Sequence, residues 1–167
     1  MKIGVVSDTH YDVLEGNIKK FFENLSNEVD FLIHAGDIDK LDFLIDLKMM
    51  FENRFVAVSG NMDSGKILEH LNDIETITIE KLRISVTHTG GHPSETVEKA
   101  IETFKKTPSD IIIFGHSHHP YNQYHGKTLL FNPGSLMDKR YAPYTSYGIL
   151  EINNGKIISS NIIPVTV

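Results

Sequence analysis

Short apolar runs rich in β-branched residues alternate with longer stretches of helical period over the first two thirds of the chain. The apolar run at residues 3–6 predicts a strand. In residues 17–25 apolar side chains recur at intervals of three and four, which predicts a helix with one apolar face. The same alternation predicts strands at 31–33, 55–58 and 111–114, helices at 41–50, 66–71 and 97–104, and a hairpin of strands 76–79 and 82–87. Ser94 is predicted to cap the helix at 97–104.

The last third of the chain changes to pairs of strands joined by tight turns. One pair, 121–124 and 128–131, flanks Gly126-Lys127, and the other, 147–152 and 157–163, flanks an Asn-Gly dipeptide, the strongest short hairpin signal. Strand–helix–strand units followed by an antiparallel meander predict an α/β (α+β) fold, in which two sheets pack together with helices outside.

Composition narrows the classes of protein that this chain can belong to. At 167 residues it fits one domain, covering 1–167, and can bury a core of its own. A net charge of −6 disfavours extended nucleic-acid binding. The absence of cysteine excludes disulfides and thiol ligands and fits a reducing compartment. Because the apolar start turns polar at Ser7-Asp8, we expect neither a signal peptide nor a membrane span, and predict a cytoplasmic protein.

Polar side chains of related chemistry follow five predicted strands at the point where each strand ends. Ligands bind at the carboxyl ends of strands in α/β sheets, so we expect these residues to meet at one edge. Imidazole and carboxylate groups suit Mn, Fe, Zn or Ni, and two such ions together can clamp the oxygens of an in-line displacement. The residues are Asp8, His10, Asp37, Asn61, His88, His116 and His118.

Taken singly, each of these fragments has a simpler explanation. Asp-x-His, Gly-Asp and Gly-Asn are ordinary turn sequences, and only Gly115-His116-Ser117-His118 is unusual by itself. Their occurrence in order at the ends of five predicted strands favours a metal pair over a set of caps and loops. The glycines at 36, 60 and 115 would allow close approach of the backbone to these groups. His34 is predicted to be buried, beside the site.

The ordered blocks D-x-H, G-D, G-N-x-D, a strand-closing His and G-H-x-H span positions 8–118 and resemble those of the calcineurin-like metallophosphoesterases. The Met-Lys-Ile-Gly start and the stretch Asn132-Pro133-Gly134-Ser135 look more narrowly like the small single-domain bacterial and archaeal phosphodiesterases of that superfamily. The resemblance covers nearly the whole chain. It implies a four-layer αββα fold, a two-sheet β-sandwich flanked by helices.

The resemblance also implies a role for each block. Asp37, Asn61 and His116 are expected to act in catalysis, Asn61 also to bind substrate, and Asp63 to orient a ligand. Two divalent ions are the implied cofactors, with Mn²⁺ first and Ni²⁺, Fe²⁺, Zn²⁺ or Co²⁺ as alternatives. The matched ligands are Asp8, His10 and His118 for one metal, Asn61, His88 and His116 for the other, and Asp37 between the two.

This sequence departs from the family pattern in two places. Many phosphatases of the superfamily have a His after the Asn, where this chain has Met62, which cannot protonate a leaving group. His119 or His92 could take that role, but the sequence places neither of them. The strand-closing His is usually followed directly by Gly, whereas here the run is His88-Thr89-Gly90-Gly91-His92. His88 ends the strand and is the preferred ligand, with His92 as the alternative.

A charge count favours one class of substrate. Two divalent ions, a bridging hydroxide, Asp8 and Asp37 leave one net positive charge, which the monoanion of a phosphodiester would neutralise. A monoester dianion would need a further cation, for which Arg140 is the candidate. Together with Met62, the count favours hydrolysis of small phosphodiesters by in-line attack of the metal-bridging hydroxide.

Other functions remain open at this point. The alternatives are a nuclease, a cyclic-nucleotide or dinucleotide phosphodiesterase, and a catalytically weak interaction scaffold like the retromer subunit of the same fold. All the predicted ligand positions carry competent side chains, which disfavours the scaffold. We expect no extended nucleic acid and no membrane as partners. A homo-oligomer is compatible with the sequence, which carries no signal for the oligomeric state.

Overall fold

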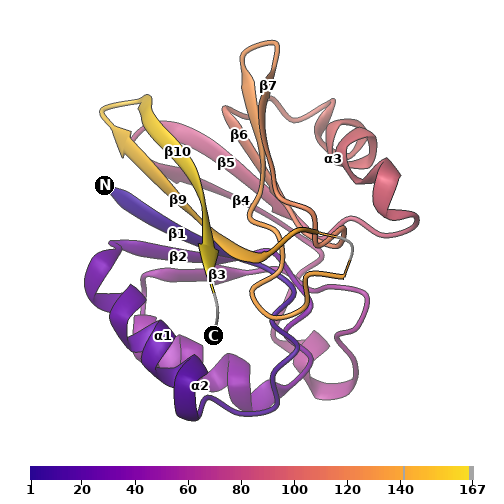
Figure 1. The fold of residues 1–167 in the computed structure, drawn as a ribbon. Coiled ribbons are helices and arrows are strands. Elements are labelled where there is room, and N and C mark those ends of the chain that lie inside the picture. Colours follow the sequence, from indigo (N-terminus) through magenta and orange to yellow (C-terminus); the bar gives the residue numbers. More distant parts are fainter. Residues whose placement is uncertain (141, 166–167) are drawn as a thin grey trace.

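Two sheets pack face to face in the computed structural model, which describes residues 1–140 and 142–165, and helices cover their outer sides (Figure 1). The elements in chain order are β1 (Lys2–Val6), α1 (Gly16–Glu28), β2 (Phe31–His34), α2 (Leu41–Phe51), β3 (Phe55–Ala57), the 3-10 helix η1 (Gly65–Glu69), β4 (Ile74–Ile79), β5 (Leu82–Thr87), the 3-10 helix η2 (Pro93–Glu95), α3 (Thr96–Phe104), β6 (Ile111–Phe114), β7 (Tyr121–His125), β8 (Thr128–Asn132), β9 (Thr145–Asn153) and β10 (Lys156–Val165).

Each sheet combines three neighbouring parallel strands with antiparallel pairs. The first sheet has the order β10-β9-β1-β2-β3, in which β1, β2 and β3 are parallel. The second has the order β4-β5-β6-β8-β7, in which β5, β6 and β8 are parallel. The predicted hairpins are present as β4–β5, β7–β8 and β9–β10. The predicted two-sheet architecture is therefore confirmed.

Alternating side chains along the strands fill three apolar layers. Ile3 and Val5 of β1 face the core between the sheets, while Val6 belongs to the core under α1 and α2. In β6, Ile113 likewise faces the other sheet, and Phe114 packs under α3. Helix, sheet, sheet and helix thus form the four layers of an αββα sandwich.

Local details differ from the sequence prediction at two short helices. The helix expected at 66–71 is the 3-10 helix η1, and Ser94 does not cap α3. Pro93 fixes its own φ and begins η2 before α3, so Ser94 lies inside η2 and donates its backbone N–H to His92 Nδ1. Among the described helices, none is long and apolar enough to cross a membrane.

Candidate metal centre

The predicted ligands follow strands of both sheets. Those after β1, β2 and β3 come from the first sheet, and those after β5 and β6 come from the second, so the site joins the two sheets at one edge of the sandwich. The glycines in these loops allow the close approach that the sequence predicted. A Cβ on Gly60 would lie 2.1 Å from Asp37 Oδ1, and one on Gly36 would lie 2.5 Å from the His88 Cβ.

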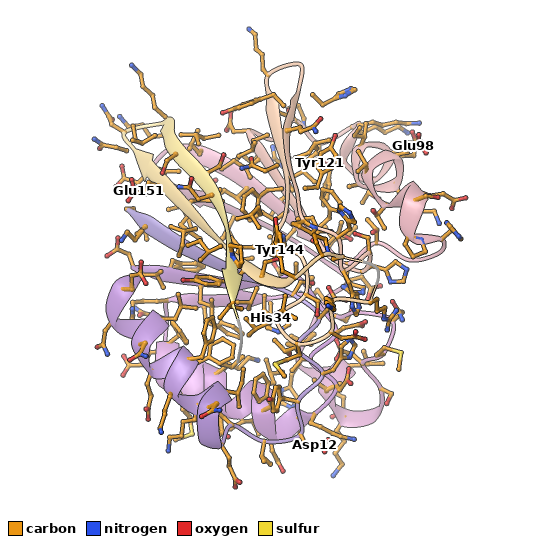
Figure 2. The ribbon with its side chains drawn as sticks, viewed as in Figure 1. Asp12, His34, Glu98, Tyr121, Tyr144 and Glu151 are labelled. Carbon is orange, nitrogen blue, oxygen red and sulfur yellow. The ribbon has the colours of Figure 1, made fainter. Side chains whose placement is uncertain are left out.

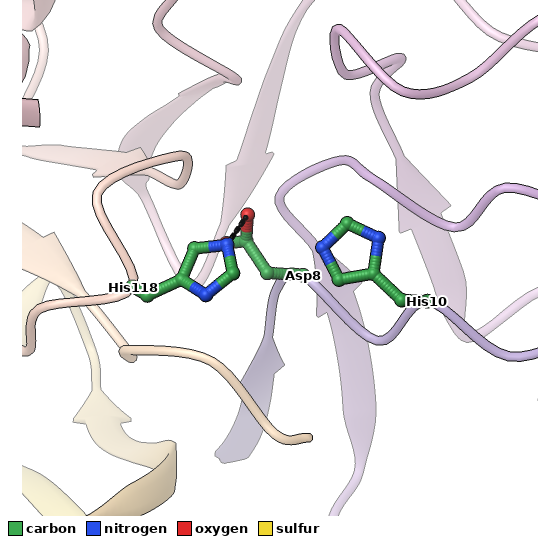
Figure 3. A group of neighbouring side chains, drawn as sticks. All are labelled: Asp8, His10 and His118. Atoms are coloured by element: carbon green, nitrogen blue, oxygen red, sulfur yellow. Dashed lines mark ion pairs between the residues drawn. The ribbon is translucent and has the colours of Figure 1, made fainter. Parts of the chain in front are cut away.

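Asp8, His10 and His118 form the first group of ligand atoms. Their side chains converge, with Asp8 between the two imidazoles (Figure 3), and one ligand atom from each lies within 4.8 Å of the others. His118 Nε2 is 3.1 Å from Asp8 Oδ1. Asp8 and the His118 side chain are buried, and His10 is partly exposed. This is the group that the D-x-H and G-H-x-H blocks predict together.

Asp8, Asp37 and His88 form a second group within the same 4.8 Å limit. His88 Nε2 lies 3.4 Å from Asp37 Oδ2 and 4.0 Å from Asp8 Oδ1. The same Asp37 oxygen lies 3.9 Å from His10 Nε2 of the first group. Asp37 thus lies near imidazoles of both groups, and Asp8 is a member of both; the assignment of each residue to one metal or the other stays a prediction.

Asn61 and His116 complete the second group on its exposed side. The amide oxygen of Asn61 is 3.2 Å from His88 Nε2 and 2.6 Å from His116 Nδ1. The fold therefore brings all seven predicted residues to one place. His92, the alternative to His88, uses Nδ1 to accept the Ser94 N–H.

Two buried ligand atoms make no hydrogen bond within the described part of the chain, although one of them, Asp8 Oδ1, forms the ion-pair contacts with His118 and His88 given above. They are Asp8 Oδ1 and His10 Nε2, both facing the centre of the first group. Buried polar atoms are normally satisfied, and an unsatisfied pair of carboxylate and imidazole atoms is what a divalent cation would bind. The residues present therefore fit a metal site of oxygen and nitrogen ligands.

The close packing of carboxylates and imidazoles shifts the pKa values of Asp8 and His88. Burial raises the pKa of Asp8, but contact with His118 and the charge of His88 outweigh it and lower that pKa to about 2. Burial lowers the pKa of His88, but Asp37 and Asp8 raise it to about 9. An imidazolium at His88 thus balances the two carboxylates, in the place that a metal cation would take.

Polar partners behind the site fix the orientation of the imidazoles. Nδ1 of His10 is 3.0 Å from Asp39 Oδ2, and Nδ1 of His88 is 2.7 Å from the carbonyl oxygen of Ala35. Nδ1 of His118 bonds the carbonyl oxygen of Asp138. In each ring Nε2 is consequently left for the site, the usual arrangement of metal-binding histidines. Asp39 was not among the predicted site residues, and its only signal in the sequence is that it is a second acid two residues after Asp37.

Asp63 joins the loops that follow β2 and β3. Its Oδ1 accepts the backbone N–H groups of Ile38 and Asp39, at 2.9 and 2.6 Å, and its Oδ2 accepts that of Gly60 at 2.7 Å. Burial raises the pKa of this carboxyl. Asp63 therefore holds the backbone around Asp37 and Asn61 instead of pointing into the metal groups.

Ser135, the last residue of the Asn-Pro-Gly-Ser stretch, connects two segments of the site. Its buried hydroxyl donates to the carbonyl oxygen of Asp8 at 2.8 Å and accepts the N–H of Asp138 at 2.9 Å. One hydroxyl therefore links the backbone of one candidate ligand to the segment that orients another, His118.

Five of the seven candidate ligands have a left-handed backbone. For residues other than glycine this region costs roughly 1–2 kcal/mol each and is sparsely populated. Strained residues cluster where the surrounding structure fixes them for a function. The five, with their φ angles, are Asp8 (53°), His10 (49°), Asp37 (56°), His116 (83°) and His118 (57°).

The remaining sequence expectations concern residues at the rim. Met62 is 51% exposed, and its backbone N–H donates to Asp37 Oδ1 at 2.8 Å. Arg140 is exposed, and its Nε pairs with Asp138 Oδ2 at 3.2 Å. The exposed His119 side chain contacts the carbonyl oxygen of Pro120 through Nδ1. His34 is fully buried as predicted, and bonds Thr9 through Nε2 at 3.1 Å.

Comparison with known proteins agrees with this geometry. The calcineurin-like phosphoesterase superfamily domain matches residues 1–155. A phosphodiesterase of Methanocaldococcus jannaschii is 34% identical over 146 residues, which are 80% of this chain and 83% of that protein. The solved structure of an archaeal phosphodiesterase has a TM-score of 0.74 at 27% identity and covers 98% of this chain and 100% of the other.

A solved structure of Vps29 from Entamoeba histolytica, complexed with Zn²⁺, shares the fold, with a TM-score of 0.72 at 23% identity over 99% of this chain and 98% of that one. The family match over most of the chain, the relative at 34% identity and the converging ligand set all agree. The chain therefore belongs to the calcineurin-like phosphoesterase superfamily and is a metal-dependent phosphoesterase.

Proposed function

We propose that this phosphoesterase hydrolyses small phosphodiesters with a pair of divalent metal ions. The observation that carries the proposal is the position of Asp37, whose Oδ2 faces His10 Nε2 at 3.9 Å and His88 Nε2 at 3.4 Å. A carboxylate oxygen between two imidazoles of different ligand groups is suited to join two cations. Asp8, His10 and His118 would hold one ion, Asn61, His88 and His116 the other, and Asp37 both.

The ions and the protein would divide the chemistry between them. When bound, the metal pair supplies a water of lowered pKa for in-line attack on phosphorus, together with positive charge for the phosphoryl oxygens. Asn61 stands at the exposed side, where its amide N–H groups can donate to a non-bridging oxygen of the substrate. Asp63, Asp39 and Ser135 keep the ligands in position through the bonds described above.

Two features support diesters over monoesters. The protein supplies no imidazole at Met62, so protonation of a poor alkoxide leaving group lacks a donor there. Arg140, the cation expected to help a dianion, already pairs with Asp138. A monoanionic diester needs neither group when its leaving group is good.

The ligand set also bears on the choice of metal. Imidazole, carboxylate and amide donors without thiols suit Mn²⁺, which we propose as the working ion, with Ni²⁺, Fe²⁺, Zn²⁺ and Co²⁺ as competitors. Metal analysis of protein purified without added metal, followed by reloading of chelator-treated protein with each ion, tests this choice. Higher activity with Zn²⁺ than with Mn²⁺ at saturation would count against it.

The proposed reaction is tested with two substrates that share an aryl leaving group. We expect the reloaded enzyme to cleave bis(p-nitrophenyl) phosphate with a higher kcat/KM than p-nitrophenyl phosphate. Arg140→Gln should leave the diester rate unchanged within about twofold, because a group held by Asp138 is not needed for a monoanion. Faster cleavage of the monoester by the wild-type enzyme would overturn the diester preference.

A further inference from the structure

A cavity of about 480 Å³ opens beside the second ligand group. Asn61 and His88 line one side, and Lys99, Glu102 and Thr103 of α3 line another. The loop after β3, the start of β4 and the end of β5 form the rest. Its volume lies within the range of small-molecule pockets. A phosphoryl group held at Asn61 and His88 would therefore present one of its ester oxygens to this cavity.

The wall of the cavity offers mainly hydrogen-bond acceptors. Its hydroxyl groups already give their hydrogens to the protein, so the oxygen lone pairs are what they present to a ligand. The bonds are from Ser59 to the Asp73 carboxylate at 2.6 Å, from Thr87 to the Asp73 carbonyl at 3.4 Å, from Thr89 to the Gly115 carbonyl at 3.3 Å, and from Thr103 to the Lys99 carbonyl at 2.7 Å.

The charges in the wall do not suit an anion. Lys99 Nζ donates to the Gly90 carbonyl at 2.8 Å and pairs with Glu95 at 3.0 Å, so its charge is already matched. Glu102 is matched in the same way by Lys105. Apart from His88, which belongs to the ligand group, the charged side chain of the wall that forms no ion pair with the described residues is Asp73, whose carboxylate accepts a bond from the neutral Ser59 hydroxyl.

We propose that this cavity binds the alcohol half of the phosphodiester, and that it selects a neutral alcohol with several hydroxyl groups over one that carries a second phosphate. The inference rests on the proposed diesterase function. Hydroxyl donors complement a wall of acceptors, and a further phosphate would meet the unmatched charge of Asp73. Ile74, 46% exposed, offers an apolar contact for the carbon skeleton of the alcohol.

Three diesters with the same p-nitrophenyl leaving group test the selection, because they differ only in the second alcohol: propyl, glyceryl or phosphoglyceryl. We expect kcat/KM for the glyceryl diester to exceed that of the propyl diester about tenfold, the effect of one or two net hydrogen bonds. The phosphoglyceryl diester should be the poorest. Asp73→Asn, which keeps the acceptor for Ser59, should raise kcat/KM for that diester several-fold. Glu98→Gln, on α3 (Figure 2), is not part of the cavity wall and should change none of these rates.

A binding measurement separates this inference from the proposed reaction. The metal-loaded protein is titrated calorimetrically with glycerol 3-phosphate and with propyl phosphate, neither of which is a diester. Tighter binding of glycerol 3-phosphate without cleavage of any diester would overturn the proposed function and support the cavity assignment. Equal binding of the two phosphates, or equal rates for the propyl and glyceryl diesters, would overturn the cavity assignment even in an active diesterase.

Discussion

Nδ1 of His10 lies 3.0 Å from the carboxylate of Asp39, while the opposite ring nitrogen lies 3.9 Å from Asp37. The two acids are two residues apart in one loop, and both have a left-handed backbone. One loop thus supplies the carboxylate between the two ligand groups and the carboxylate that orients a ligand of the first group. Such a partner fixes the ring and raises the basicity of the nitrogen that faces the metal.

Asp39→Asn should therefore lower the affinity for Mn²⁺ about tenfold, since removal of an orienting partner typically costs 10–100-fold. Isothermal titration calorimetry of the chelator-treated protein with Mn²⁺ measures this affinity. The matched control is Asp12→Asn, which removes an exposed acid that pairs with Lys40 at 3.7 Å. An unchanged affinity in Asp39→Asn would mean that His10 needs no orienting partner.

Asp37→Asn tests the position between the two ligand groups. If Asp37 joins two ions, its replacement should weaken the binding of both ions. The purified variant should then retain little of either metal and little activity. Metal content per chain by mass spectrometry is the measurement, with Asp42→Asn on the exposed side of α2 as the control. Full metal content with retained activity would refute the bridging role.

The sequence predicted more of the ligand set than of its support. Strand-end residues such as Asp8 and His88 could be predicted because parallel strands bring their carboxyl ends together, a rule that needs only strand positions. The carbonyl groups of Ala35 and Asp138, which orient His88 and His118, carry no sequence signal, because every residue has a carbonyl group. Their contribution depends on loop conformation, which the residue pattern does not specify.

The residue pattern also could not settle the cap of α3 or the membership of Asp8 in two ligand groups. Ser94 has the chemistry of a cap, but Pro93 begins a 3-10 turn first, and that local competition decided the outcome. Asp8 was assigned to one metal from its block alone. Its place in both ligand groups depends on the distance across the two sheets to His88, which is a property of the packed sandwich.

Gly60→Ala should disrupt the metal centre through a steric clash with Asp37. The new Cβ would lie 2.1 Å from Asp37 Oδ1 and 2.3 Å from its backbone nitrogen, so the loop carrying Asp37 must move. We expect loss of most metal binding and a lower free energy of unfolding. Gly126→Ala provides the comparison, because its φ of +62° is unfavourable for alanine while nothing lies within 4 Å. That variant should lose about 1 kcal/mol of stability and keep its metals. Similar metal content in both variants would contradict the packing argument.

His116 allows the backbone strain of the site to be measured directly. Its φ is +83°, which glycine adopts without strain and alanine does not. His116→Gly should therefore be more stable than His116→Ala by about 1 kcal/mol, although both variants lose the same imidazole. Urea unfolding in the presence of a chelator gives the difference. At Ser117, which lacks a positive φ, the order should reverse, with Ala more stable than Gly. If alanine were the more stable at both positions, the left-handed backbone would cost nothing, and the ligand loops could not be described as strained.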